Sequence, residues 1–143
     1  EKVIKIMRLA TGRIIRRLRQ GKMQNELREI RGYNRPPHKV LTVVTCLFIL
    51  LGNVNLEPYV GRLFNIPKEG ETQAMWKFLR GHMEVTKLLK TMGGFKTPQS
   101  NRAKAVSAYL SEISHKDATA SSKAVCELRK WCIIKSNLGL MSL

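Results

Sequence analysis

The chain has 143 residues, of which 43% are hydrophobic, and 26 Lys and Arg residues against 10 Asp and Glu residues give it a net charge of +16. This length and hydrophobic content exclude a disordered tail and predict one domain with a buried core. The positive charge is divided evenly between residues 1–35 and the rest of the chain. So basic a protein favours a polyanionic partner: nucleic acid, an anionic membrane or an acidic protein lattice.

Residues 1–31 contain no proline and are expected to be helical. Two sets of apolar residues follow the spacing of a coiled-coil seam, namely Val3, Met7, Ala10 and Ile14, and then Met23, Leu27 and Ile30. The sets do not share one register, because Ile14 and Met23 are nine residues apart, and Gly12 and Gly21 weaken the helix around this gap. A single amphipathic helix with a solvated basic face is the alternative interpretation.

The sequence Asn34-Arg35-Pro36-Pro37 separates this basic segment from the apolar run Val40–Leu51. Two prolines remove two backbone donors and disfavour the helical region for Arg35, so one helix is expected to end near residues 32–34. Proline is tolerated in the first turn of a helix, and the apolar run is long enough to form the next one. Its 12 residues are too few to span a bilayer, which needs about 20, so we expect a core helix that ends at Gly52.

Residues 53–72 are rich in proline and glycine and are expected to form a loop or flap. Within it, Tyr59-Val60 and Leu63-Phe64 could pair as a short β-hairpin around Gly61-Arg62.

The remaining segments predict three helices. The first covers Gln73–Met92 and stops at Gly93-Gly94, and the second runs from Thr97 to about Ile113. A polar stretch follows, in which Ser121 or Ser122 is the expected N-cap of the last helix. The fold class predicted from the sequence is all-α.

Catalytic and metal-binding motifs are absent from the sequence. The three histidines are far apart, and Asp117 is the only aspartate, so paired-carboxylate chemistry is poorly supplied. Cys46, Cys126 and Cys132 lack zinc-ligand spacing and are expected to be buried, reduced thiols. We therefore expect a binding module rather than an enzyme, with no cofactor and no metal.

Four motifs, in this order, resemble the microtubule-binding domain at the tip of the dynein heavy-chain stalk. They are Glu29-Ile30-Arg31 with Asn34-Arg35-Pro36-Pro37, then Cys46–Gly52, then Trp76-Lys77 leading to Leu88-Leu89 and Phe95, and finally Ser122-Lys123-Ala124 through Lys130-Trp131. The resemblance covers roughly residues 27–135. No single motif is decisive, and their order and spacing together carry the likeness.

The resemblance implies a small helical bundle at the tip of an antiparallel coiled-coil stalk. Residues 1–33 would be the outgoing stalk helix, residues 34–130 the head, with a flap at about 53–72, and residues 131–143 the start of the returning helix. The coiled-coil core would contain Leu27, Ile30, Trp131 and Ile134. The first and last head helices would face tubulin, with contacts from Arg35, Lys39, Lys123, Arg129 and Lys130, and further contacts from Arg62 and Lys68 on the flap.

Two departures from the family pattern bear on these expectations. The family carries a basic residue one turn after the double proline, where this chain has Leu41, with Lys39 two residues earlier. The segment before Trp76 is longer than in cytoplasmic dyneins and is similar to the flap insertion of some axonemal dyneins. The resemblance thus implies a cytoskeletal location in the ciliary axoneme, the microtubule as partner, and room for a dynein light chain, without a membrane partner.

Two other functions remain open from the residues alone. Clustered Lys and Arg at a sequence pI of about 10.4 also indicate nucleic-acid binding, although the few aromatic residues are not interleaved with the basic ones as stacking platforms. A protein-interaction bundle using Tyr59, Leu63 and Phe64 of the flap is the third interpretation.

Overall fold

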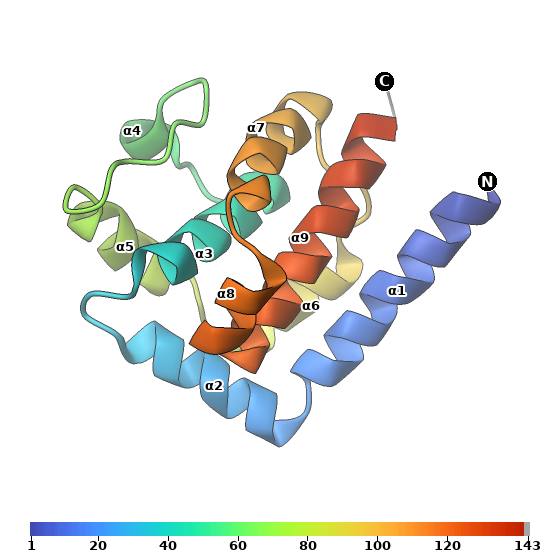
Figure 1. The fold of residues 1–143 in the computed structure, drawn as a ribbon, viewed down its shortest axis with the longest axis horizontal. Helices are drawn as coiled ribbons and strands as arrows, with labels where there is room; N and C mark the ends of the chain where they lie inside the picture. The colour runs from blue at the N-terminus through green and yellow to red at the C-terminus, as the bar shows by residue number, and fades with distance from the viewer. Residues whose placement is uncertain (142–143) are drawn as a thin grey trace.

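The structure is a computed structural model that describes residues 1–141. In this part of the chain there are nine helices and no strand, which confirms the predicted all-α class (Figure 1). The helices are α1 (Lys2–Leu18), α2 (Gly21–Gly32), α3 (His38–Leu51), α4 (Glu57–Val60), α5 (Gln73–Arg80), α6 (Val85–Gly94), α7 (Ser100–Ser111), α8 (His115–Ser121) and α9 (Lys123–Met141).

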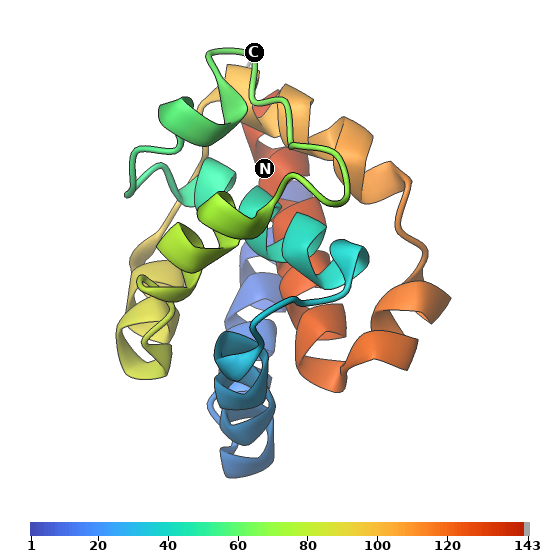
Figure 2. The same cartoon turned by 90° about the vertical axis from the view of Figure 1, so that its left-hand side faces the viewer.

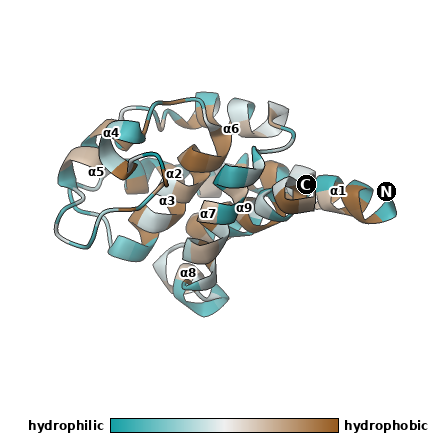
Figure 3. Ribbon diagram, turned by 90° about the horizontal axis from the view of Figure 1, so that it is seen from above, coloured by the Kyte–Doolittle hydropathy of each residue, from teal (hydrophilic) through white to brown (hydrophobic). Residues whose placement is uncertain are grey.

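Helix α9 lies at the centre of the molecule and packs against α1, α2, α3, α7 and α8. Its buried residues point to several sides, from Val125 and Leu128 to Trp131 and Leu138. Helix α1 runs antiparallel to α9, so the N-terminus and the last turn of α9 lie at the same end of the molecule (Figure 1). Figure 3 shows hydrophobic residues gathered on the inner helices and hydrophilic residues on α8 and the loops.

Helix α3 is the core helix that the sequence predicts. Every residue from Val40 to Leu51 is buried, as expected for a helix that is apolar on all sides. The helix begins directly after the double proline and ends at Gly52, whose φ of 62° is left-handed. The Arg102 guanidinium donates a hydrogen bond of 3.0 Å to the Ile49 carbonyl, one of the acceptors that a helix C-terminus leaves open.

The expectation of one helix over residues 1–31 is wrong. Helix α1 ends at Leu18 and α2 starts at Gly21, with Gln20 in an extended conformation between them. The two apolar sets are out of phase, and the bend lets α1 bury Ile14 while α2 buries Leu27 and Ile30. The broken spacing between Ile14 and Met23 was therefore the signal of a bend.

The expectation of one helix over Gln73–Met92 is also wrong. The chain forms α5 and α6, and the Glu84 carboxylate begins α6 by accepting hydrogen bonds from the backbone N–H groups of Thr86 and Lys87. The polar stretch before α9 holds a further helix, α8, that the sequence analysis missed. Ser122 caps α9 as predicted, since its Oγ accepts from the backbone N–H of Ala124 at 3.0 Å.

The flap hairpin is not confirmed. Tyr59 and Val60 lie in α4, and no strand occurs between residues 53 and 72. Two positive φ angles, 69° at Gly61 and 58° at Phe64, turn the chain there. The flap rests on the body through a hydrogen bond of 2.9 Å from the Ile66 N–H to the Tyr109 hydroxyl.

Burial of the three cysteines is confirmed, and each is a free thiol. Desolvation in the core raises the pKa of the Cys46 and Cys132 thiols. No helix within residues 1–141 has both the length and the apolar character needed to cross a membrane.

The close packing of α9 on α7 predicts the effect of Gly139→Ala. A Cβ at this position would lie 2.7 Å from the Ala103 Cβ and 2.9 Å from the Pro98 Cγ. We expect a loss of about 1–3 kcal/mol in the free energy of unfolding, measured by urea denaturation. Gly12→Ala is the matched control, because a Cβ there meets no atom within 4 Å, and it should add up to about 1 kcal/mol. Equal effects of the two changes would contradict this packing.

Candidate functional site

Basic residues from three separate segments lie at one end of the molecule. The start of α3, helix α8 and the first turn of α9 are neighbours there (Figures 1 and 2). We call this region the basic end and define it by Lys39, Lys116 and Lys123, all of which are exposed, whereas the exposed Arg35 lines a pocket with Glu69 of the flap and Gln73 of α5. Arg35 precedes α3, Lys39 is on α3, Lys116 is on α8 and Lys123 is the first residue of α9.

An ion pair joins α3 to α8 at the basic end. The Lys39 Nζ lies 3.0 Å from the Asp117 Oδ2, and both side chains are partly exposed. The hydrogen bond from Lys39, and a second one from Ser114, lower the pKa of Asp117 below its usual value. Exposed pairs contribute little to stability, so the main effect of this pair is to hold Lys39 beside α8.

A partly buried carboxylate of α2, that of Glu26, contacts the start of α9. The Glu26 Oε1 accepts hydrogen bonds from the Ser122 Oγ at 2.7 Å and from the Ala124 N–H at 3.3 Å. A carboxylate is favourable at a helix N-terminus, because unpaired N–H groups and the helix dipole attract negative charge. Partial burial raises the pKa of Glu26, but these hydrogen bonds outweigh it and the pKa is lowered. This contact positions Lys123 at the basic end.

Arg129 and Lys130 do not join the basic end. The Arg129 Nε donates to the Ile113 carbonyl at 2.7 Å, in the turn between α7 and α8. The Lys130 Nζ lies 3.6 Å from the Glu127 carboxylate, which also binds Arg17 of α1. Both basic side chains are partly buried against neighbouring helices.

The flap cations lie apart from α8 and α9. Arg62 is 90% exposed and lies 3.4 Å from the Glu57 carboxylate. Lys68 is exposed near the end of the flap, which meets the double proline at a pocket lined by Arg35 and Glu69. Of the apolar flap residues, Leu63 is exposed.

Tyr59 and Phe64 of the flap face the body of the protein. The Tyr59 ring lies 5.2 Å from the Phe78 ring, and the Phe64 ring lies under the Arg102 guanidinium at 4.9 Å. Both rings are partly buried against the core, whereas Leu63 is 78% exposed.

The expected coiled-coil residues lie together in the core. Leu27, Ile30 and Trp131 are buried, and Ile134 is partly buried against the hydrophobic core. The Trp131 ring also contacts Phe95 at 5.9 Å, so helices beyond the expected pair contribute to this region. The burial of these residues does not by itself confirm a coiled-coil seam.

Sequence reasoning missed Lys116 and Glu26. Lys116 is in a polar stretch whose helix was not predicted. Glu26 meets Ser122 across 96 positions of the chain, and no local pattern signals such a pair.

Comparison of the chain with protein-family models, with curated proteins and with solved structures finds no significant match. Within residues 1–141 there is no group of three or more His, Cys, Asp and Glu side chains that could hold a metal ion.

The Glu26 contact predicts a pH-dependent loss of stability in Glu26→Gln. We expect the free energy of unfolding at pH 7 to fall by about 1 kcal/mol, as for other N-terminal caps. Because the pKa of Glu26 is lowered on folding from the usual 4.5, its contribution is present above 4.5 and is lost as the pH falls through the folded value. The difference between variant and parent should therefore shrink in acid.

Urea denaturation at a series of pH values measures this difference. Glu29→Gln is the matched control, because Glu29 is an exposed residue of the same helix. A pH-independent difference, or an equal one for Glu29→Gln, would contradict the cap.

The pair between α3 and α8 predicts a titration shift. In Lys39→Met, the NMR pKa of the Asp117 carboxyl should rise, because its main stabilising hydrogen bond is removed. An unchanged pKa would contradict the pairing of α3 with α8.

Proposed function

We propose that this chain is the microtubule-binding head of a dynein-type stalk. The observation that carries the proposal is the basic end, where cations that are distant in sequence lie on neighbouring helices. Lys39 and Lys123, expected from the family motifs, are separated by 84 positions and are both adjacent to α8. The order of helices is also compatible with a stalk head, since the first head helix, α3, supplies Lys39 and the last one, α9, supplies Lys123.

Electrostatics supports the same partner. Microtubules present acidic surfaces and acidic tails, which attract a protein of net charge +16 over long range. The attraction between exposed charges is screened at moderate salt, because the Debye length is about 8–10 Å. Binding is therefore expected to weaken steeply as the ionic strength rises.

Helices α1, α2 and α9 would provide the base of the stalk. The antiparallel pair α1 and α9 is compatible with the start of an antiparallel coiled coil. Val3 of the expected seam is 57% exposed on the N-terminal half of α1, where a longer partner helix would cover it. The bend at Arg19 and Gln20 would allow α1 to change register against α9, and half a heptad of sliding corresponds to about 5–6 Å.

The proposal extends to the cellular setting. A stalk head of this kind would act in the cytoskeleton, and the long flap favours an axonemal dynein of the cilium. A dynein light chain remains a candidate second partner, and a parent motor would supply the ATPase activity that this binding module is not expected to have.

Co-sedimentation with microtubules tests the proposed function. Lys116→Gln combined with Lys123→Gln should weaken binding by about 2- to 30-fold, since each exposed charge contact contributes about 0.2–1 kcal/mol. Lys77→Gln combined with Lys87→Gln is the control: it removes the same charge from α5 and α6, on the opposite side from α8 (Figures 2 and 3). Thermal unfolding checks that both variants are folded.

An equal loss of microtubule binding in the two double variants would contradict the proposal, because binding would then depend on total charge alone. Duplex DNA at the same salt concentrations is the second arm. Tighter binding to DNA than to microtubules, with the same dependence on Lys116 and Lys123, would favour the nucleic-acid function.

A further inference from the structure

A cavity of about 390 Å³ lies between α1, α6 and α9, away from the basic end. Six of its lining residues are cationic: Arg8, Arg16, Arg19, Lys90, Lys96 and Lys135. No carboxylate lines the cavity in the described part of the chain. Like charges in one place repel each other, so this arrangement costs stability unless an anion occupies the cavity.

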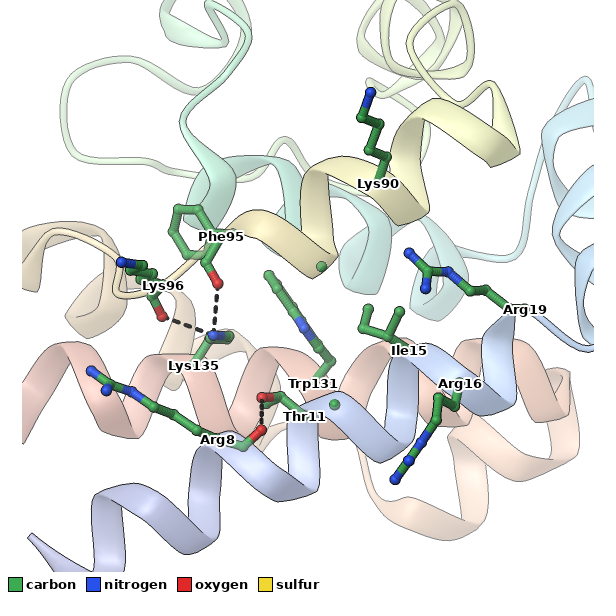
Figure 4. A pocket seen from close by; sticks show the side chains of 12 residues that line it. Arg8, Thr11, Ile15, Arg16, Arg19, Lys90, Phe95, Lys96, Trp131 and Lys135 are labelled. Atoms are coloured by element: carbon green, nitrogen blue, oxygen red, sulfur yellow. Dashed lines mark hydrogen bonds between the residues drawn. The ribbon is translucent and has the colours of Figure 1, made fainter.

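The floor of the cavity contains a buried ammonium group. Lys135 is only 4% exposed, and its Nζ donates to the carbonyls of Phe95 at 2.9 Å and Lys96 at 2.8 Å (Figure 4). An ammonium group has three N–H donors, so these two hydrogen bonds leave one for a ligand. Burial, and to a smaller extent the charge of Arg8, lower the pKa of Lys135 to about 8. A bound anion would favour the charged ammonium and so counteract both the burial and the repulsion by Arg8.

The Trp131 indole ring also lines the cavity. Its Nε1 is buried and has no hydrogen-bond partner within residues 1–141. A buried donor without a partner costs about 1–3 kcal/mol. The ring stands between α1 and α6 beside Lys135, and the Arg19 guanidinium extends from the end of α1 toward α6 (Figure 4).

Gly12 leaves room for a ligand, whereas a Cβ added at Gly93 would lie 3.5 Å from the Arg19 Nη2. Gly12 on α1 and Gly93 on α6 both line the cavity, and a Cβ added at Gly12 would meet no atom within 4 Å. The volume is within the range of about 300–1,000 Å³ that is usual for small-molecule sites. Guanidinium groups match phosphate oxygens through paired hydrogen bonds, which favours phosphate over other anions.

We propose that the cavity between α1, α6 and α9 binds a small, multiply phosphorylated compound, either free or as a lipid headgroup. The ligand would contact the guanidinium groups of Arg8 and Arg19 and the Lys135 ammonium. This site is independent of the proposed microtubule function, because it shares no residue with the basic end.

Calorimetric titration with inositol hexakisphosphate tests the site. Arg8→Gln combined with Arg19→Gln should weaken binding at least about 100-fold, since each of the two charge-assisted contacts contributes about 10-fold or more. Lys5→Gln combined with Arg13→Gln is the matched control: it removes two exposed cations of the same helix that do not line the cavity, and it should change the affinity less than about two-fold. Equal losses in both pairs would overturn the proposal.

NMR of the two indole N–H groups gives an independent readout in the unmodified chain. The Trp131 resonance should move on addition of inositol hexakisphosphate. The Trp76 resonance should not, because its Nε1 donates to the Tyr33 carbonyl at 2.7 Å elsewhere in the fold. A Trp131 resonance that stays in place at saturation would overturn the proposal.

A variant that supplies its own anion tests the electrostatic argument. Gly12→Glu should raise the melting temperature relative to Gly12→Gln, which has nearly the same shape, and should abolish binding of inositol hexakisphosphate. A lower melting temperature for Gly12→Glu than for Gly12→Gln would contradict the excess of positive charge in the cavity.

Vesicles distinguish the two sources of phosphate. Sedimentation with phosphatidylcholine vesicles, with and without phosphatidylinositol 4,5-bisphosphate, should show binding that depends on Arg8 and Arg19 if the ligand is a headgroup. Binding of the soluble compound alone, with the same dependence, supports a free phosphate. A glutamate-rich peptide that binds as tightly as inositol hexakisphosphate would overturn the assignment to phosphate.

Discussion

The burial of α9 on several sides is the constraint on which the rest of the structure depends. Five helices pack against it, yet it carries four lysine and arginine residues and one glutamate in its first 13 residues. Buried charge is costly unless it is paired. The fold therefore provides a partner for each charge that α9 cannot expose: the Ile113 carbonyl for Arg129, Arg17 for Glu127, and two carbonyls after α6 for Lys135.

This constraint separates two basic regions along one helix. Helix α9 begins beside α8, and its first residue, Lys123, belongs to the basic end. Twelve residues later, about 18 Å along the axis, Lys135 is on the floor of the cavity beneath α1 and α6. Of the cations between them, Arg129 donates to the Ile113 carbonyl and Lys130 lies beside the Glu127 carboxylate of α9 itself. The two regions thus differ in kind, one being an open surface suited to a large acidic partner and the other a cavity suited to a small anion.

The sequence was sufficient where local chemistry decides the structure. The double proline and Gly52 delimit α3, and Ser122 caps α9, because these residue types act on their own backbone. It was insufficient where tertiary contacts decide. Helix α8 is polar and short, and it exists because Ala118 packs into the core while Asp117 pairs with Lys39. The expected hairpin instead became a turn and a short helix.

For the candidate site, the composition predicted a basic protein but not which cations are free. Lys123 and Lys130 are seven residues apart on one helix face, and their sequence context is similar. In the structure Lys130 lies 3.6 Å from the Glu127 carboxylate, which also binds Arg17 of α1, while Lys123 is exposed. The family motifs pointed to α3 and α9, and the fold adds Lys116 of α8 and the supporting contact from Glu26.

We propose that the basic end is the surface that binds the acidic surface of the microtubule. Lysine acetylation rates, measured by mass spectrometry with and without microtubules, test it residue by residue in the unmodified chain. We expect Lys39, Lys116 and Lys123 to be protected from acetylation by microtubules, while Lys77 and Lys87 keep their acetylation rates. Protection of Lys77 and Lys87 instead, or equal protection of all five, would contradict it.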